Sequence, residues 1–129
     1  MRYLLDTHAL LWALTKPATL SPTAHEVIVD RGTTLLSSAA SAWEVATKSR
    51  LGRLPQATGL LSAWDRNLQR LGCEHLPITD EHAMLAGSLD WVHRDPFDRM
   101  LAAQAISESL VLITRDPAFG TLRGVRTLW

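Results

Sequence analysis

Residues 3–6, Tyr3-Leu4-Leu5-Asp6, are a short apolar run that ends in an acid. Continuous apolar runs of this length are typical of strands buried on both faces. Similar runs recur along the chain, and helical patterns separate most of them: Thr34-Leu35-Leu36, His75-Leu76-Pro77-Ile78, Leu110-Val111-Leu112-Ile113 and Val125-Arg126-Thr127-Leu128. The alternation predicts an α/β fold in which helices cover both faces of a parallel sheet.

The segments between these runs carry helix start and stop signals. The helix after Asp95-Pro96 is apolar nearly all round, so we expect it to pack deeply against the sheet. The expected helices run from Ser21-Pro22 to Gly32, from Ser38 or Ser41 to Gly52, from Thr58 to Gly72, from Thr79 to about Asp90, and from Asp95-Pro96 through residue 106.

Composition favours a single compact domain over residues 1–129, because 47% of the residues are hydrophobic and only 20% are charged. The one cysteine, Cys73, suggests a reducing compartment, and no apolar run approaches the roughly 20 residues of a membrane span. We therefore expect a cytoplasmic protein that does not enter the membrane. The formal net charge of zero argues against a strongly basic nucleic-acid binder, so any recognition of phosphate must be local.

Two acids follow predicted strands. Asp6 comes directly after the first strand and Asp116 lies three residues beyond Ile113. Each alone is explained by a helix cap or a turn. Together they point to one sheet edge, where two carboxylates repel each other unless a cation lies between them.

Two further acids lie on predicted helices. Asp98 falls in the first turn of the helix after Asp95-Pro96, where the helix dipole stabilises a carboxylate. A capping box formed with Asp95 is the structural explanation of this acid. Glu44 lies in mid-helix, where an ion pair with Lys48 four residues later is the simplest explanation from the residues alone.

The sequence lacks the motifs of several other kinds of active site. The histidines show no H-x-x-x-H pair, and we expect them at the surface or around the site. The sequence also lacks the motifs of dinucleotide-binding, P-loop and α/β-hydrolase proteins. The tryptophans could stack on bases, although aromatic residues at helical spacing more often belong to the core. They are Trp12, Trp43, Trp64, Trp91 and Trp129.

Four blocks of sequence carry a family resemblance. They are residues 3–12 (YLLDTHALLW), 38–48 (SAASAWEVATK), 95–105 (DPFDRMLAAQA) and 112–116 (LITRD). In this order and spacing the chain resembles a PIN-domain ribonuclease of the VapC toxin type. The resemblance implies a doubly wound sheet of four or five strands, a homodimer, a small antitoxin partner and cleavage of RNA that depends on Mg²⁺ or Mn²⁺.

The resemblance also assigns residues. It makes Asp6, Glu44, Asp98 and Asp116 the catalytic, metal-binding acids, which replaces the simpler explanation of Glu44. We expect Asp6, Asp98 and Asp116 to bind the metal directly, and Glu44 to act through water. A metal-positioned water would then attack the phosphodiester and leave 5′-phosphate and 3′-hydroxyl ends.

Residues beside the acids complete the expected site. Arg99 and Arg115 adjoin acids and are candidates for binding substrate phosphate, with an ion pair to those acids as an equal alternative. Thr7 and Thr114 are candidates for orienting the metal ligands by hydrogen bonds, and Asp95 is a neighbour whose role is open.

Two other functions fit a fold of this size. A receiver-like signalling domain also has acids at strand ends, but the expected positions hold Asp6-Thr7, Ser37-Ser38 and Arg115-Asp116 in place of paired acids, a central Asp and a late Lys. A catalytically silent binding module, in which the acids only cap helices, is the second alternative.

Overall fold

A computed structural model describes residues 1–57 and 59–129 of the chain. Its elements are β1 (Arg2–Leu5), α1 (Thr7–Thr15), α2 (Pro22–Val29), β2 (Thr34–Ser38), α3 (Ala39–Arg50), α4 (Trp64–Leu71), β3 (Cys73–Leu76), α5 (Asp80–Ser88), α6 (Pro96–Ser107), β4 (Val111–Ile113) and β5 (Arg126–Leu128). Short 3-10 turns join some of them, among them Leu61–Ala63 and Pro117–Thr121.

In the described part of the chain, five parallel strands form one sheet in the order β3-β2-β1-β4-β5. The α/β fold and the parallel sheet are therefore confirmed. The chain winds outward from β1 in one direction through β2 and β3, and in the other through β4 and β5. The strand order thus reverses between β1 and β4, and ligands of such sheets bind beyond the carboxyl ends of the strands at this switch point.

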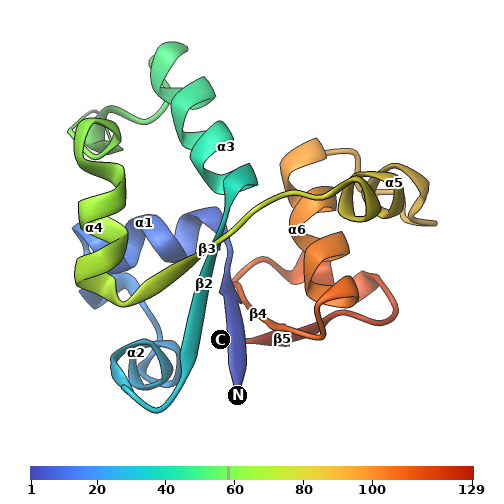
Figure 1. The fold of residues 1–129 in the computed structure, drawn as a ribbon, viewed down its shortest axis with the longest axis horizontal. Coiled ribbons are helices and arrows are strands. Elements are labelled where there is room, and N and C mark those ends of the chain that lie inside the picture. Colours follow the sequence, from blue (N-terminus) through green and yellow to red (C-terminus); the bar gives the residue numbers. More distant parts are fainter. Residues whose placement is uncertain (58) are drawn as a thin grey trace.

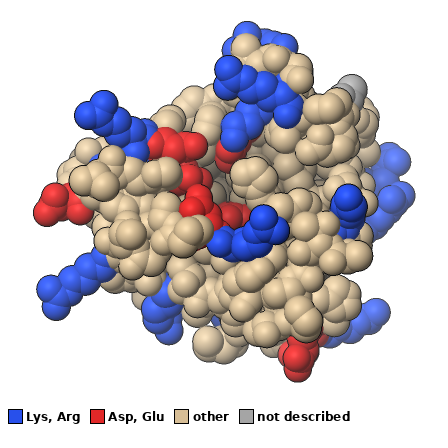
Figure 2. Space-filling model, turned by 180° about the vertical axis from the view of Figure 1, so that it is seen from behind, with Lys and Arg blue, Asp and Glu red and all other residues tan. Residues whose placement is uncertain are grey.

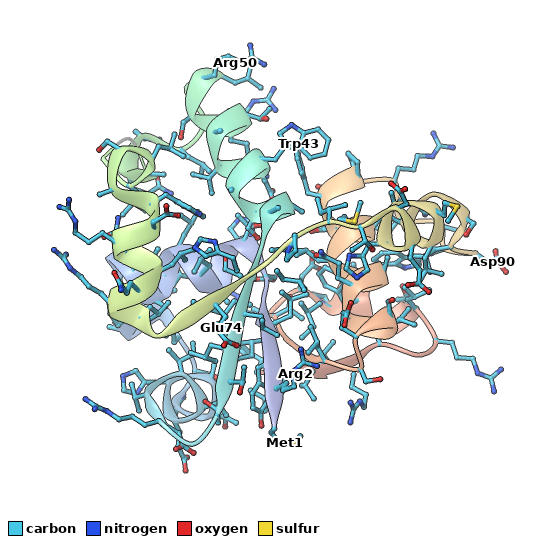
Figure 3. The ribbon with its side chains drawn as sticks, viewed as in Figure 1. Met1, Arg2, Trp43, Arg50, Glu74 and Asp90 are labelled. Carbon is cyan, nitrogen blue, oxygen red and sulfur yellow. The ribbon has the colours of Figure 1, made fainter. Side chains whose placement is uncertain are left out.

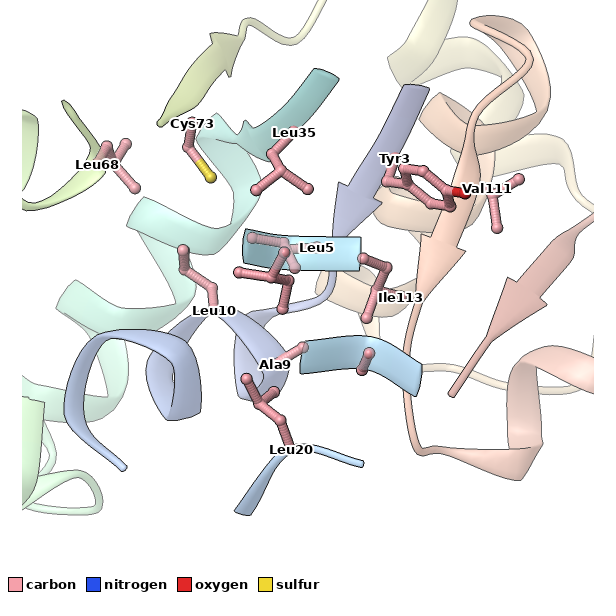
Figure 4. Close-up of a cluster of buried hydrophobic side chains, with 12 residues drawn as sticks. Tyr3, Leu5, Ala9, Leu10, Leu20, Leu35, Leu68, Cys73, Val111 and Ile113 are labelled. Atoms are coloured by element: carbon pink, nitrogen blue, oxygen red, sulfur yellow. The ribbon is translucent and has the colours of Figure 1, made fainter. Parts of the chain in front are cut away.

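Helices cover both faces of the sheet, with α1, α2 and α4 on one side and α5 and α6 on the other (Figure 1). Alternate residues of β1 enter the two cores: Tyr3 and Leu5 pack with Leu10 and Ile113 (Figure 4), while Leu4 packs against α6. As expected, α6 is deeply packed, and residues 101–105 are all buried. This packing fixes the start of α6 beside the sheet edge.

Most helix ends agree with their signals. Ser38 caps α3 through a 2.9 Å hydrogen bond to the N–H of Ala40, and Thr79 caps α5. Gly72 ends α4 with φ 78°, a left-handed conformation that glycine adopts without strain.

Several boundaries differ from the prediction, and α2, expected to run to Gly32, ends at Val29. The helix expected from Thr58 begins at Trp64, because Ala63 leaves the helical region with φ −131° and ψ 33°; residue 58 lies outside the described residues. The third strand runs from Cys73 to Leu76, earlier than the predicted 75–78, since Pro77 has no N–H to continue the ladder.

Candidate active site

Asp6 is fixed at the end of β1 by the backbone and by its own side chain. Its N–H donates to the carbonyl of Ile113 at 3.0 Å, which joins the ends of β1 and β4. Its Oδ1 accepts from the N–H of Ala9 at 2.7 Å and so caps α1. The side chain is buried, and little freedom remains for it to turn away from the sheet edge.

Burial raises the pKa of Asp6 above its ordinary value, and the negative charge of Glu44 adds to the rise. A hydrogen bond from the Thr114 hydroxyl favours the carboxylate form and opposes both effects. Thr114 Oγ1 also accepts from the N–H of Asp116 at 3.0 Å, so one threonine links the loops that carry two of the acids.

Glu44 reaches the same edge from α3 and is only 3% exposed. One carboxylate oxygen, Oε2, accepts from Lys48 Nζ, the pair that the spacing predicts. The other oxygen, Oε1, is buried and has no hydrogen-bond partner. A buried carboxylate oxygen without a partner is costly, so Glu44 is suited to a positively charged ligand.

Asp98 lies in the first turn of α6, which Asp95 caps by accepting from the N–H groups of Phe97 and Asp98. The Asp98 side chain does not close a capping box; its Oδ2 lies 2.7 Å from Nε2 of His93. Burial raises the pKa of Asp98 to about 6, the charges of Asp95 and Glu44 add to the rise, and the hydrogen bond with His93 opposes it. Glu44 therefore interacts with both Asp6 and Asp98 across the sheet edge.

Asp116 completes the edge after β4. Its Oδ1 accepts from the N–H of Ala118 at 2.9 Å, and the residue is exposed. Asp6 and Asp116 line one cavity of about 350 Å³ together with His8, Trp12, Arg115 and Pro117. Figure 2 shows acidic side chains gathered in a hollow on one face of the molecule, with basic side chains at its rim. The predicted acids are thus linked in space, from Asp116 through Asp6 and Glu44 to Asp98.

The two candidate phosphate ligands, Arg115 and Arg99, have different partners. Arg115 lies over the ring of Trp12, with Cζ 5.2 Å from the ring centroid, and faces the cavity of Asp6 and Asp116. Arg99 donates instead to four backbone carbonyls, those of Ala86, Leu89, Trp91 and His93, at 2.7–3.0 Å. This use differs from both expected uses of Arg99, phosphate binding and an ion pair with the acids.

The other neighbours of the acids also have identifiable uses. The Thr7 hydroxyl lies 3.0 Å from the Ser41 hydroxyl and joins the start of α1 to α3. The Thr114 hydroxyl makes the expected hydrogen bond to a carboxylate, that of Asp6. His93 fits the expectation of a histidine around the site, although no sequence motif singled it out. His82 does not fit, because it is 1% exposed and belongs to the capping box of α5.

Arg99→Met is expected to lower the melting temperature by roughly 10 °C, because it removes the donors for carbonyls of the segment that carries His93. Arg99→Lys is expected to lower it nearly as much, since an ammonium cannot replace a planar fork. Arg94→Met removes a nearby exposed arginine and is the matched control. Equal melting temperatures for Arg99→Met and Arg94→Met would contradict this role.

A PIN domain family model matches residues 3–124. The chain belongs to the PIN-domain family. The strand order β3-β2-β1-β4-β5 excludes the receiver-like alternative, because receivers of the CheY type have the order 2-1-3-4-5.

Several solved structures share this PIN fold. A chain of VapBC2 from Rickettsia felis, bound to a DNA fragment from their promoter, has a TM-score of 0.74 at 18% identity, covering 99% of this chain and 98% of that one. DNA-bound VapBC from Salmonella typhimurium gives 0.69 at 18% identity, with 99% and 97% covered. VapC20 from Mycobacterium tuberculosis, a sarcin-ricin loop cleaving toxin, gives 0.60 at 18% identity, with 96% and 98% covered. A search of curated protein sequences gives no significant match.

The acids of this PIN domain are compatible with a hydrated metal. Within the described residues, no three His, Cys, Asp or Glu side chains are gathered closely enough to hold an ion by themselves. Mg²⁺ usually retains several waters and takes one or two carboxylates, so a dedicated cage is not required. The unpartnered buried Glu44 Oε1, between Asp6 and Asp98, provides a suitable oxygen.

None of the helices in the described part of the chain is long and apolar enough to span a membrane.

Proposed function

We propose that this PIN domain, over residues 1–129, is a metal-dependent endoribonuclease of the VapC toxin type. The observation that carries the proposal is the buried, unpartnered oxygen of Glu44 between two further acids at the switch point of the sheet. Structural relatives support it: VapBC-5 from Mycobacterium tuberculosis is named as a member of the VapBC family of toxin-antitoxin systems, and VapC20 is named as a sarcin-ricin loop cleaving toxin. The test is cleavage of RNA by the purified chain with Mg²⁺ or Mn²⁺.

The alternative of a catalytically silent binding module, in which the acids only cap helices, accounts for fewer of the acids. Asp6 and Asp116 cap a helix and a turn, as that alternative requires. Glu44 lies in mid-helix and Asp98 bonds a histidine side chain, so neither caps anything. Burying these carboxylates beside one another costs stability, and a metal-dependent function explains why they are there.

Asp6, Asp98 and Asp116 are the proposed ligands of a hydrated Mg²⁺ or Mn²⁺ ion, with one or two of them bound directly and the others through water. Glu44 would accept a hydrogen bond from the attacking water and orient it. A divalent ion supplies stabilisation of the charge that develops on the phosphate and makes a nearby water more acidic. The hydrogen bond from Thr114 favours the ionised form of Asp6, and His93 fixes the direction of the Asp98 carboxylate. No protein nucleophile is then needed, and the products would carry 5′-phosphate and 3′-hydroxyl ends.

Arg115 is the proposed phosphate ligand. It is exposed, lines the cavity with Asp6 and Asp116, and is oriented by the face of Trp12. Arg99 holds the His93 segment and contributes to the site through Asp98. The arrangement gives a neutral protein a local cationic contact for RNA.

We also propose a small antitoxin partner, a homodimer and a cytoplasmic location. Beside the acidic cavity lies a second one of about 370 Å³, lined by His8, Leu11, Trp12, Thr15, Lys16 and Gln56. Trp12 and His8 line both cavities, so a partner segment along α1 would lead to the acids. Leu10 and Leu11 are buried in the core and add little contact surface.

An arginine of the antitoxin is expected to occupy the acidic cavity, where it can pair with carboxylates and exclude the metal. The partner encoded next to this gene would be co-expressed, the complex purified, and each partner arginine replaced by Ala. One replacement is expected to restore RNA cleavage without dissolving the complex. A stable complex that cleaves RNA at the rate of the free enzyme would contradict occlusion of the site.

A further inference from the structure

Trp43 is the exposed tryptophan of this protein, with 55% of its surface open to solvent. It lies on α3 immediately before Glu44 and projects towards the side of α6 (Figure 3). Its ring meets the ring of Phe97 edge-on, with centroids 4.7 Å apart and an interplanar angle of 74°. Phe97 immediately precedes Asp98 on α6.

The other tryptophans are used differently. Each is partly buried: Trp12 packs against Trp129, Trp91 against Phe119, and Trp64 against two cores. An exposed large aromatic ring, held in place by a second ring, is an informative exception to burial. Beside this contact, more than half of the Trp43 surface stays open to solvent.

The aromatic pair and the acidic pair occupy adjacent positions on the same two helices. Glu44 and Asp98 interact through their charges, and their preceding residues Trp43 and Phe97 are in ring contact. A phosphate held at the acids would place the base of a flanking nucleotide beside these rings, because base and phosphate are joined through one sugar. We infer that Trp43, supported by Phe97, stacks a nucleobase next to the scissile phosphate, an inference that rests on the proposed function.

Stacking suits the electrostatics of this chain. The formal net charge is zero, so release of counterions from RNA supplies little affinity beyond the local cations. Stacking on an aromatic side chain adds affinity without charge and accepts any base, because every base has a π-face. Trp43 is therefore a positioning residue for single-stranded RNA and not a reader of base edges.

A second copy of the chain is the competing occupant of this surface. A two-fold contact centred on Trp43 would bury the ring without using the acids beside it. A nucleotide would use both, because its phosphate meets the acids through a metal ion while its base meets the ring. The adjacency of Trp43 to Glu44 therefore favours the nucleobase, and a second copy is an outcome that the test distinguishes.

The test compares Trp43→Ala, Trp43→Phe and the control Leu61→Ala, which removes another exposed apolar side chain, on the 3-10 turn before α4. Binding is measured with Mg²⁺ in an Asp6→Asn background, where the RNA stays intact, using an octamer of adenylate and an abasic ribose-phosphate octamer. Trp43→Ala is expected to weaken binding of the adenylate octamer about tenfold and to leave binding of the abasic octamer unchanged. Trp43→Phe and Leu61→Ala are expected to stay within about threefold of the parent.

Kinetics in the wild-type background give a second measure: Trp43→Ala is expected to raise KM for RNA about tenfold and leave kcat nearly unchanged. Equal losses for both octamers, or no loss for either, would overturn the inference. So would a Trp43→Ala protein that sediments as a monomer where the wild type is a dimer and binds adenylate normally. If the wild type cleaves no RNA but the loss specific to the adenylate octamer is found, the proposed function fails while the stacking site stands.

Discussion

Asp6→Asn and Asp98→Asn are each expected to lower RNA cleavage at least about 100-fold while the metal-free fold stays as stable as, or more stable than, the wild type. Each change removes one charge from a cluster of buried and half-buried acids, which relieves repulsion. Asparagine keeps an oxygen that can cap α1 at position 6, so the local structure is preserved. Loss of activity without loss of stability is the signature of a catalytic acid.

For Asp98 the stability difference should depend on pH. Its pKa is about 6 in the folded protein and 3.8 ordinarily, so the folded state binds a proton more tightly than the unfolded state. This group therefore makes the wild type less stable as pH rises through about 6, and the penalty is absent below about pH 4. Asp98→Asn is expected to melt roughly 3–5 °C above wild type at pH 7.5, with the gap closing by pH 4.

Asp90→Asn is the matched control, because it makes the same chemical change at an exposed acid beyond α5 (Figure 3). It should leave cleavage and the pH dependence of melting unchanged. Thermal melts without metal and initial cleavage rates with Mg²⁺ give both quantities. An Asp6→Asn or Asp98→Asn protein that is unstable but fully active per folded molecule would show that the acid is structural.

Chelation is expected to abolish cleavage completely, and added Mg²⁺ or Mn²⁺ to restore it, because the proposed reaction depends on a metal-positioned water and uses no histidine as acid or base. The metal should also stabilise the fold, by about 2.7 kcal/mol at a metal concentration 100 times Kd. Asp6→Asn should show a smaller rise in melting temperature with Mn²⁺, and Asp90→Asn the same rise as wild type.

Full activity in excess EDTA would contradict the metal-dependent proposal. Products that end in 2′,3′-cyclic phosphate would contradict the water mechanism, because they require attack by the 2′-hydroxyl of the RNA.

The sequence predicts the architecture well because its signals are local. Strand ends and caps depend on neighbouring residues, as at Ser38 and Thr79, and the acids that follow strands must reach one sheet edge. The β3 boundary was misplaced because the apolar pattern at 75–78 outweighed the missing N–H of Pro77.

The candidate site was harder to predict, because its contacts join distant segments. Local spacing predicts the pair of Glu44 with Lys48, and both residues do pair, but the approach of Glu44 to Asp6 and Asp98 depends on how α3 and α6 meet the sheet. Arg99 looked like a phosphate ligand because it adjoins an acid. Three of its four carbonyl partners, those of Leu89, Trp91 and His93, belong to the irregular segment between α5 and α6, whose path cannot be read from the sequence.

The most direct measurement is sequencing of RNA ends after a brief pulse of expression of the wild type and of Asp6→Asn. With the wild type we expect new 5′-phosphate ends at a limited set of RNA sites, paired with 3′-hydroxyl ends, and with Asp6→Asn we expect none of them. The same new ends in both cultures, or none in either while the wild-type chain accumulates in folded form, would contradict the claim that these acids form a ribonuclease site.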